Sequence, residues 1–503
     1  MEGTTYKTKE SVMRRAKEAI GIPLKEIDTT GRLATGKGAI GTVIEESWYG
    51  YTPNSESEPD FPEAGVELKV TPYVRTRKGI RAKERLVCNI INYMEEYKLT
   101  FETSSFWHKC STMLLMSYEH KDGVPKGEFT IDEAVLFSFP EEDLLIIEND
   151  WKTIIDKIRS GRAHTISEGD TLYLGACTKG VNASSTRPQP FSDIPAKQRA
   201  FSLKASYMTQ VLNNYIFGNV ASERVIKEWS DPLLITPEQC EDHLETWYEK
   251  SDNKVIKDWH ILLEDTFEQY IEKRLRPYYG KTIDELRTIF RIESNAKNIV
   301  ELLLGKMLGI DGKISKSEEF LKAGIVPKTI RLMPDGKSKE SMSFPPFHFI
   351  ELSKQTWETS SLNEILSSTR FLFVVFQSEY TDDPAEMVDS FNVAGGRIQE
   401  APKGVTGFKF KKVLFWNMPP DDIEEVRSVW EKTVDAIRKG VTLTVTSKGV
   451  ENNLPKATES RVAHVRPHAQ NGNDKLPLPD GRMMTKQSFW LNSGYIAEQI
   501  REG

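Results

Sequence analysis

The chain is poor in cysteine: it has 4 cysteines among 503 residues, and none of them forms a C-x-x-C pair. Cys88, Cys110, Cys177 and Cys240 stand far apart. This spacing excludes a closely spaced zinc site and a disulfide framework. We expect free, mostly buried thiols. The 8 histidines include no HExxH pair, so the sequence gives no support to a zinc hydrolase.

A membrane-spanning apolar run is also missing, and the opening segment MEGTTYKTKESVMRRAKEAI lacks the apolar core of a secretion signal. We therefore expect a cytoplasmic location. An excess of positive charge is missing too, because the net charge is −7 and the pI is about 5.8. A protein that coats DNA without specificity is usually basic, so any DNA contact must come from a local basic surface.

What remains is an ordinary globular composition, with 38% apolar and 28% charged residues. The length suggests about two to four domains. A series of motifs occurs twice in the same order, which indicates two homologous halves. The five matched pairs are RRAKEAIGIPLKEI (14–27) with KRLRPYYGKTIDEL (273–286), DFPEAGVELKV (60–70) with EFLKAGIVPKT (319–329), FETSS (101–105) with WETSS (357–361), DWKTIIDKIRSG (150–161) with VWEKTVDAIRKG (429–440), and FSLKASY (201–207) with FWLNSGY (489–495).

These matches predict a first domain over 1–215, a helical linker over 216–264 and a second domain over 265–503. Within the first half, the patterns predict helices over 10–27, 37–49 and 150–160 and a helix from about 207. They predict strands over 65–72, 86–93, 173–176 and 201–203.

The segment around Asp60, Glu67 and Lys69 has the residue types that metal-assisted cleavage of a phosphodiester needs. Carboxylate oxygens hold a hard cation, and an amine offsets the charge that develops at the phosphate. In a strand, Glu67 and Lys69 point to one face while Leu68 faces the core. The Leu68 carbonyl is then free to serve as a further metal ligand. Asp60, at the mouth of the preceding turn, can reach the same ion.

The bare triplet has a second interpretation, because an E-x-K motif in a charged chain is often a solvated strand face. Two features favour the catalytic interpretation of this motif. The flanking apolar residues place the motif on a partly buried strand, where unpaired charges are costly. A basic loop follows at once and contains Arg75, Arg77, Lys78, Arg81, Lys83 and Arg85.

The second half repeats the scaffold without the chemistry. Glu319 stands at the place of Asp60 and Lys328 at that of Lys69, but Val326 replaces Glu67 and Ile365 stands in place of Lys109. Without a carboxylate at the place of Glu67, the second half should hold a hard cation poorly. We expect it to bind DNA without cutting it.

The first half resembles the MutH mismatch-repair endonuclease and the type II restriction endonucleases related to it, which act at GATC. The resemblance rests on KGAIGTVIE (37–45), PDFPEAGVELKVTP (59–72), FETSSFWHK (101–109), DWKTIIDKIRSG (150–161), YLGACTKGVNA (173–183) and FSLKASYMTQVL (201–212). It implies an α/β (mixed α+β) fold with two restriction-endonuclease-like domains of the PD-(D/E)xK, MutH type. Each would have a mixed central sheet flanked by helices. The duplicated layout is similar to the GATC-cutting restriction enzymes.

The resemblance implies that Asp60, Glu67 and the Leu68 carbonyl hold Mg²⁺, with Lys69 and Lys109 as catalytic lysines. A helix glutamate of the family falls on Glu45 when counted from Lys37 and on Glu46 when counted from Asp60; Glu45 is preferred. Further DNA contacts are implied for Lys179, Ser202 and Lys204, and in the second half for His468, which stands at the place of Lys179. A phosphate contact or plain solvation is as good an explanation of Lys179.

The mismatch-repair enzyme has a tyrosine at the place of Ser202 that senses adenine methylation, so we expect methylation-insensitive cleavage here. Trp490, opposite Ser202 in the repeat, is assigned to the core. The resemblance also implies double-stranded DNA with GATC sites as the partner, self-association on DNA, an effector role for the second half and a companion methyltransferase. Two alternatives stay open: a nicking mismatch-repair enzyme and a noncatalytic DNA-binding protein. A hydrolase of small phosphate compounds is more remote.

Overall fold

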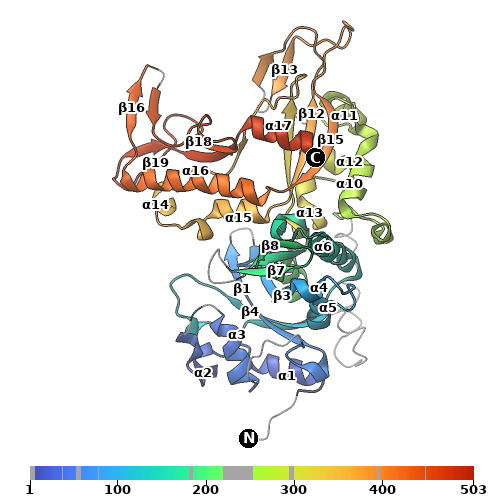
Figure 1. Cartoon of the computed structure of the whole chain (residues 1–503), viewed down its shortest axis with the longest axis vertical. Coiled ribbons are helices and arrows are strands. Elements are labelled where there is room, and N and C mark those ends of the chain that lie inside the picture. Colours follow the sequence, from blue (N-terminus) through green and yellow to red (C-terminus); the bar gives the residue numbers. More distant parts are fainter. Residues whose placement is uncertain are drawn as a thin grey trace. The chain divides into compact units, whose positions relative to one another are not determined.

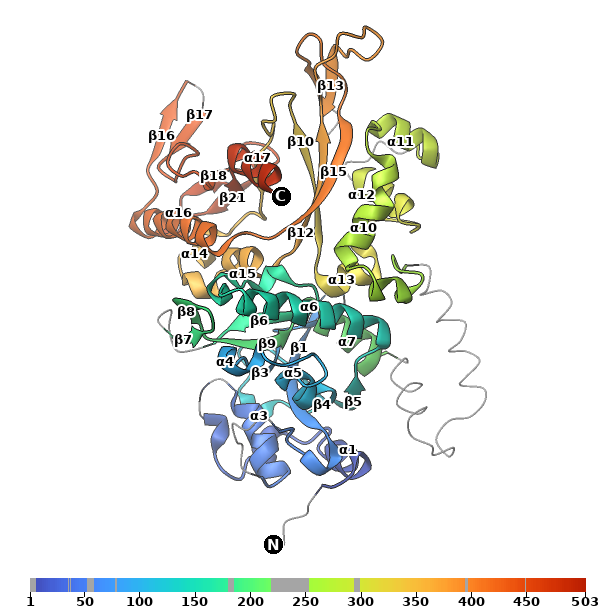
Figure 2. The same ribbon diagram turned by 45° about the vertical axis from the view of Figure 1, so that its right-hand side comes forward.

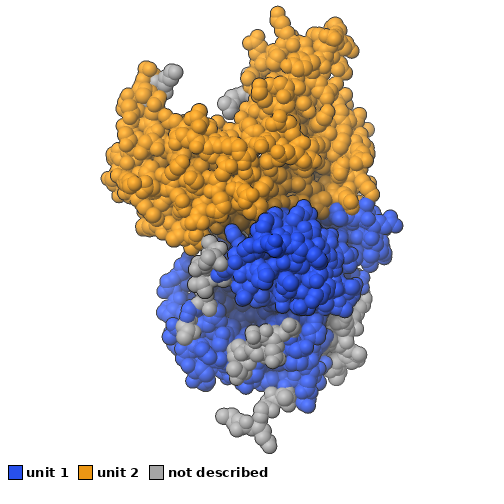
Figure 3. Space-filling view, in the orientation of Figure 1, with its two compact units in different colours: residues 1–267, 316–324 blue, residues 268–315, 325–503 orange. Residues whose placement is uncertain are grey.

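The computed structural model describes residues 6–34, 36, 38–51, 58–76, 79–179, 185–218, 253–293, 299–393, 397–447 and 449–503. Arg77, Lys78, Cys240 and most of the predicted linker lie outside the described residues. The chain forms two compact units (Figure 3). Unit 1 comprises residues 1–267 and 316–324, and unit 2 comprises residues 268–315 and 325–503. No helix in the described ranges is long and apolar enough to cross a membrane.

Unit 1 contains two separate sheets and one hairpin (Figures 1 and 2). The first sheet has the order β2-β1-β4-β5, with β1 and β4 parallel and the other pairs antiparallel. The second has the order β3-β9-β6, and β7 pairs with β8. The strands are β1 (Glu67–Thr76), β2 (Gly79–Ala82), β3 (Leu86–Ile90), β4 (Thr112–Glu119), β5 (Glu133–Ser138), β6 (Leu174–Thr178), β7 (Thr186–Gln189), β8 (Ser192–Lys197) and β9 (Arg199–Leu203).

The four helices predicted in the first half are present with shifted ends, whereas the short helices Tyr93–Glu96 and Ser105–Cys110 were not predicted. The predicted helix over 10–27 is split where Gly21 (φ 79°) and Pro23 interrupt it. The predicted helix over 150–160 starts earlier, after Pro140, with acidic residues in its first turn. The helices are α1 (Lys9–Glu18), α2 (Leu24–Ile27), α3 (Ala39–Val43), the π-helical turn η2 (Ile44–Trp48), α4 (Tyr93–Glu96), α5 (Ser105–Cys110), α6 (Glu141–Arg159), α7 (Ala205–Val211), the π-helical turn η7 (Leu212–Ile216) and α13 (Glu318–Ala323).

Unit 2 contains two sheets, of order β10-β12-β15 and β11-β21-β18, and three hairpins. Its helices are α10 (Phe267–Leu275), which begins at the last residue of unit 1's first segment, α11 (Ile283–Phe290), α12 (Ile299–Met307), α14 (Phe349–Leu352), α15 (Ser361–Ser368), α16 (Pro420–Lys439) and α17 (Ser493–Glu502). Its strands are β10 (Val326–Leu332), β11 (Met342–Ser343), β12 (Phe371–Gln377), β13 (Ser390–Val393), β14 (Arg397–Glu400), β15 (Lys409–Trp416), β16 (Leu443–Thr446), β17 (Gly449–Asn452), β18 (Ala463–Pro467), β19 (Lys475–Pro477), β20 (Met483–Thr485) and β21 (Gln487–Leu491).

The two units repeat one topology, which confirms the two-domain α/β fold expected from the sequence. In each unit two strands pair in parallel, β1 with β4 and β10 with β12. The second strand of each pair also pairs with an antiparallel strand, β4 with β5 and β12 with β15. A long helix follows, α6 in unit 1 and α16 in unit 2. The repeat extends to single hydrogen bonds. Tyr207 Oη donates to Asp143 at 3.1 Å, and Tyr495 Oη donates to Asp422 at 2.7 Å.

The units differ from the predicted domain boundaries in two respects. The described residues of the predicted linker, 216–218 and 253–264, belong to unit 1. Helix α13 lies in the second half of the sequence, between two segments of unit 2, and yet it belongs to unit 1. Lys322 of this helix forms an ion pair with Asp143 of α6 at 2.7 Å, and both side chains are 3% exposed. The boundaries 1–215, 216–264 and 265–503 stay a proposal.

Candidate active site

Strand β1 brings two of the predicted residues to one face. Glu67 and Lys69 pair with Met113 and Leu115 of the parallel strand β4. Leu68 points the other way and packs in the core of the first half with Leu114 and Met116. Because side chains alternate along a strand, the apolar positions on either side of the acid and the amine fix which face those two occupy.

A tight bend before β1 returns Asp60 to the same place. Phe61 and Val66 exchange two backbone hydrogen bonds, and Gly65 takes a left-handed conformation with φ 61°. The Leu68 N–H then donates to Asp60 Oδ2 at 2.9 Å, and the Asp60 N–H donates to Glu67 Oε2 at 3.1 Å. Since the N–H and C=O of one strand residue face the same side, the Leu68 carbonyl also faces the side of Asp60.

Two lysines approach the Glu67 carboxylate. Lys69 Nζ donates to Glu67 Oε1 at 2.7 Å and to the Cys88 carbonyl at 3.2 Å. Lys109 Nζ, on α5, lies 3.7 Å from Glu67 Oε1. Helix α5 is capped by Ser104, which accepts from the Trp107 N–H at 3.1 Å. The structure therefore brings both predicted lysines to one carboxylate.

The geometry favours Glu45 over Glu46 as the helix glutamate. Burial raises the pKa of Glu45, together with the nearby charge of Asp60, while Lys69 opposes the shift. Glu46 instead forms two hydrogen bonds with Arg32, at 2.8 and 2.9 Å, on the outside of the helix. Both glutamates lie on the π-helical turn η2, and such turns occur often at functional sites.

Burial also governs the protonation of the strand residues. It raises the pKa of Glu67 to about 7 against the opposing charge of Lys69, and Asp60 adds to the rise. Burial works to lower the pKa of Lys69, but the Glu67 carboxylate outweighs it and the net shift is upward. Lys69 is therefore a cation and is unsuited to accept a proton at neutral pH.

Tyr51 is a residue of this site that the sequence did not single out. Burial raises its pKa, and the charges of Asp60, Glu45 and Glu67 add to the shift. Its hydroxyl is buried and has no hydrogen-bond partner among the described residues. A buried hydroxyl normally has a partner, so a polar ligand held by the neighbouring carboxylates would supply the one that is missing here.

The donor set fits a hard divalent cation. In the described parts of the chain no three His, Cys, Asp or Glu side chains form a cluster suited to hold a metal ion. Mg²⁺ does not need one, since it is usually bound by one or two carboxylates with water and substrate phosphates. Asp60, Glu67 and the Leu68 carbonyl would supply such oxygens. The buried negative charge and the orphaned Tyr51 hydroxyl agree with this.

The equivalent place in the second half lacks this donor set. Lys328 pairs with Phe373 as Lys69 pairs with Leu115, and Val326 takes the place of Glu67. Glu319 does not point into a second site, because its carboxylate accepts the N–H groups of Val255 and Ile256, each at 2.9 Å. Burial lowers the pKa of Lys328, and Glu301 alone opposes the shift. Metal-dependent chemistry is therefore expected of the first half only.

The basic segment 75–85, which the sequence predicted to be a loop, includes the end of β1 and the strand β2, and these two strands pair with each other. The Arg75 guanidinium lies 5.5 Å from the Tyr73 ring centroid, and its Nε lies 3.5 Å from Glu119. Arg81 and Lys83 are exposed, and Arg85 is paired with Glu168. Arg77 and Lys78 lie outside the described residues. The DNA contacts expected of Arg75, Arg77 and Lys78 stay predictions.

The three predicted DNA contacts near β9 differ in exposure. Lys179 is half-buried, and its N–H donates to the Gln198 carbonyl at 2.7 Å. Ser202 is 1% exposed and Lys204 is 6% exposed, and Lys204 Nζ donates to the Thr171 carbonyl. In this conformation neither Ser202 nor Lys204 reaches the surface, so the geometry supports a direct DNA contact only for Lys179.

The loop that begins at His468 after β18 has the same first backbone hydrogen bond as the loop that begins at Lys179 after β6. The His468 N–H donates to the Lys486 carbonyl at 2.9 Å, which matches the bond between Lys179 and Gln198. The prediction that Trp490 belongs to the core is wrong: its ring is partly exposed and lies against Arg466 and His468. The repeat pattern alone could not show which face of β21 is covered.

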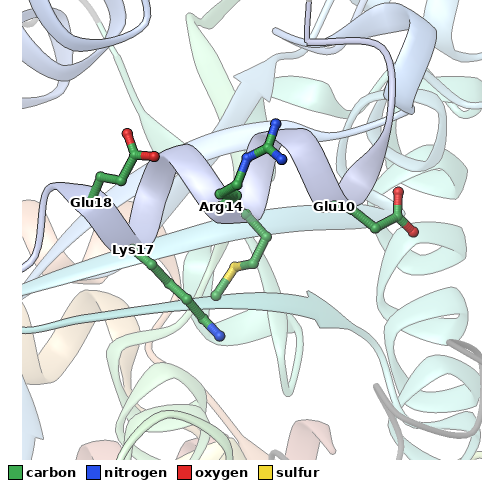
Figure 4. A pocket seen from close by; sticks show the side chains of 5 residues that line it. Glu10, Arg14, Lys17 and Glu18 are labelled. Carbon is green, nitrogen blue, oxygen red and sulfur yellow. The ribbon is translucent and has the colours of Figure 1, made fainter. Parts of the chain in front are cut away.

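A separate depression lies on helix α1 (Figure 4). Its lining residues are Glu10, Met13, Arg14, Lys17 and Glu18. None of the candidate active-site residues lines it, and its charges are of mixed sign. We assign no function to this depression.

Comparison with known proteins agrees with this arrangement. The sequence profile of the family "DNA mismatch repair enzyme MutH" matches residues 49–150, the part that carries Asp60, Glu67, Lys69 and Lys109. The chain is 36% identical to the type II restriction enzyme Sau3AI of Staphylococcus aureus, over 99% of both chains. It is 30% identical to the DNA mismatch repair protein MutH of Shewanella woodyi, over 36% of this chain and 78% of that protein. It is 26% identical to the DNA mismatch repair protein MutH of Vibrio vulnificus strain YJ016, over 41% of this chain and 93% of that protein.

Proposed function

Because the chain belongs to the family of MutH-related type II restriction enzymes that includes Sau3AI, we propose that it hydrolyses phosphodiester bonds of double-stranded DNA at GATC. The observation that carries the proposal is that Asp60, Lys69 and Lys109 converge on the buried carboxylate of Glu67. Enzymes of this fold need a divalent metal, and we propose Mg²⁺.

The residues of the site divide the work between them. Asp60, Glu67 and the Leu68 carbonyl would hold Mg²⁺, which when bound supplies Lewis-acid stabilisation of the scissile phosphate. Lys69 is held as a cation beside Glu67, so we assign it to offset the negative charge that develops on the phosphate. Lys109 adds a second positive charge on the same side. The charges of Asp60 and Lys69 act on Glu45, and we assign Glu45 to orient a water molecule at this site.

We assign DNA binding without cleavage to the second half. It repeats the scaffold of the first half but has Val326 at the place of Glu67. A second DNA-binding half suits a palindrome such as GATC. Since only one half carries the catalytic set, a double-strand break needs two chains on the DNA or two successive cuts. We propose that the second half binds a further GATC copy as an effector and that chains self-associate on DNA. A companion methyltransferase would protect host DNA.

Digestion of a plasmid tests the activity directly. With Mg²⁺ we expect linear products whose sequenced ends map to GATC, and we expect no cleavage with a chelator. Methylated and unmethylated plasmids should be cut at equal rates, because Ser202 is small and buried. A strong preference for one methylation state contradicts the insensitivity. Arrest at the open-circular form indicates a nicking enzyme, and absence of any cut at GATC contradicts the proposal.

The effector role predicts a dependence on the number of sites. At low enzyme concentration, a plasmid with two GATC sites should be cut faster than an otherwise identical plasmid with one. The reason is that a tethered second site raises the local concentration of effector DNA. Added short GATC duplexes should accelerate the one-site plasmid. Equal rates on both plasmids, unchanged by the added duplex, would exclude the effector role and leave the nuclease assignment intact.

A further inference from the structure

One strand face differs between the two halves at equivalent positions. In each half two antiparallel strands form this face, β6 with β9 and β18 with β21, and residues paired directly across the two strands point to the same side of the sheet. The first half has small residues there, namely Gly175, Cys177, Ala200 and Ser202. The second half has large or polar ones, namely His464, Arg466, Ser488 and Trp490. The half without the catalytic carboxylate thus has a cation and an aromatic ring where the first half has small side chains.

Arg466 and Trp490 form an ordered stack on this face. The guanidinium carbon of Arg466 lies 3.8 Å from the centroid of the Trp490 ring. Trp490 Nε1 donates to the Arg466 carbonyl at 3.4 Å. Arg466 is exposed and the indole is partly exposed. Stacking of this kind holds the planar guanidinium in one orientation while its N–H groups stay available.

His468 extends the cluster along the loop that follows β18. Its Nδ1 lies 2.8 Å from Ser488 Oγ, and its ring centroid lies 5.0 Å from that of Trp490. Beyond it the loop exposes three side-chain amides: Gln470, Asn471 and Asn473. The one acid of the loop, Asp474, is paired with Lys486 at 2.6 Å. The loop therefore presents neutral hydrogen-bonding groups beside a cation, without an unpaired acid to repel phosphate.

The face lies on the side of the sheet away from helix α16. Val465, Phe489 and Leu491, which alternate with the cluster residues, belong to the same core as Val426 and Trp430 of α16. Figure 3 shows unit 2 notched between the regions that Figure 1 labels β16 and β13. In Figures 1 and 2, β18 lies between α16 and this notch. The cluster therefore lies on the face of this sheet opposite α16.

The chemistry of the cluster matches the edges of DNA bases. An arginine donates two hydrogen bonds to guanine O6 and N7, and an asparagine or glutamine pairs with adenine N6 and N7. GATC contains both purines. A guanidinium held rigidly by a tryptophan ring suits a paired contact better than a free surface cation, because less rotational freedom is lost on binding.

We propose that Arg466, oriented by Trp490, contacts a guanine edge of the DNA duplex bound by the second half, with the amides of loop 468–474 beside it. Arg466 is the specificity-determining residue and Trp490 is a positioning residue. This inference rests on the proposed function, since it names the contact by which the effector half recognises its DNA.

The test uses the full chain with Lys69→Ala, which prevents cleavage, and a fluorescent duplex that contains GATC. We expect the parent chain to bind two duplexes and Arg466→Ala to bind one. Arg466→Lys keeps the charge but loses the planar fork, and we expect it to weaken the second binding event by roughly tenfold to hundredfold. Trp490→Ala should act in the same direction, with recovery in Trp490→Phe. Lys439→Ala, which removes an exposed cation of α16, is the matched control and should bind two.

Three results would overturn the inference. Two bound duplexes in Arg466→Ala would exclude the contact. The Arg466→Lys variant could keep full affinity for GATC and still discriminate fully against a duplex in which the G·C pairs are replaced. That result would indicate a phosphate contact instead. A parent chain that binds one duplex while the catalytically intact chain cuts at GATC would refute the second-half contact and leave the nuclease proposal standing. If Arg466→Ala fails to fold, Arg466→Lys carries the test.

Discussion

Replacement of Lys69 by alanine should slow DNA cleavage by at least about 10²–10³-fold, the cost of removing one preorganised electrostatic stabiliser of a transition state. Lys69 is a cation whose Nζ lies 2.7 Å from the Glu67 carboxylate, at the place where the scissile phosphate would bind. Its loss acts on the transition state more than on bound DNA, so DNA affinity should change little. Cleavage is measured as single-turnover rates on a GATC plasmid, and binding is measured without metal.

Lys328→Ala is the control that separates chemistry from fold. Lys328 occupies the same register on β10 as Lys69 does on β1, but it has no carboxylate at the place of Glu67. We expect its cleavage rate to be unchanged. Asp60→Asn is a second probe, because it keeps an oxygen for the Leu68 N–H and removes the negative charge. Normal cleavage by Lys69→Ala and Asp60→Asn would remove both residues from the active site.

Replacement of Lys322 by methionine should destabilise unit 1 by about 3–5 kcal/mol, the usual cost of leaving one member of a buried ion pair alone. Lys322 Nζ lies 2.7 Å from Asp143 Oδ1 and 2.7 Å from Glu318 Oε1, and its side chain is 3% exposed. Without it, Asp143 would keep the hydroxyl of Tyr207 as its one side-chain donor among the described residues. Urea unfolding followed by circular dichroism measures the loss.

Lys439→Met is the matched control for this prediction. Lys439 lies 2.7 Å from Asp435, the same separation, but the two side chains are 75% and 57% exposed. An exposed pair contributes about 0–1 kcal/mol, so we expect almost no shift in the urea midpoint. The double variant Lys322→Met with Asp143→Asn should recover part of the loss. A Lys322→Met chain as stable as the parent would mean that α13 does not stabilise unit 1.

The sequence was sufficient to predict which face of the catalytic strand β1 carries Glu67 and Lys69. The alternation of Val66, Leu68 and Val70 with Glu67 and Lys69 determines which face carries the charge, and the structure has that arrangement. It was also sufficient for the repeat, because motifs in the same order predict the same strand pairing. The parallel pairs β1 with β4 and β10 with β12 confirm this.

The sequence was insufficient wherever a contact joins distant segments. Glu319 aligns with Asp60, yet it caps the N–H groups of Val255 and Ile256. Lys204 was itself predicted to contact DNA, yet its amine is buried against the Thr171 carbonyl. Tyr51 had no motif to mark it, and its place beside the carboxylates follows only from tertiary packing, which sets its ring 5.4 Å from that of Phe61.

By itself, the sequence determined which residues can perform metal-assisted hydrolysis and that the second half has lost one of them, because side-chain chemistry and strand alternation are local properties. The tertiary structure decided which of those groups meet, which cations are buried and which face of the second half is open. Burial and long-range contact depend on how segments far apart in the chain pack together. That packing gives Lys322 to unit 1 and places Arg466 against Trp490.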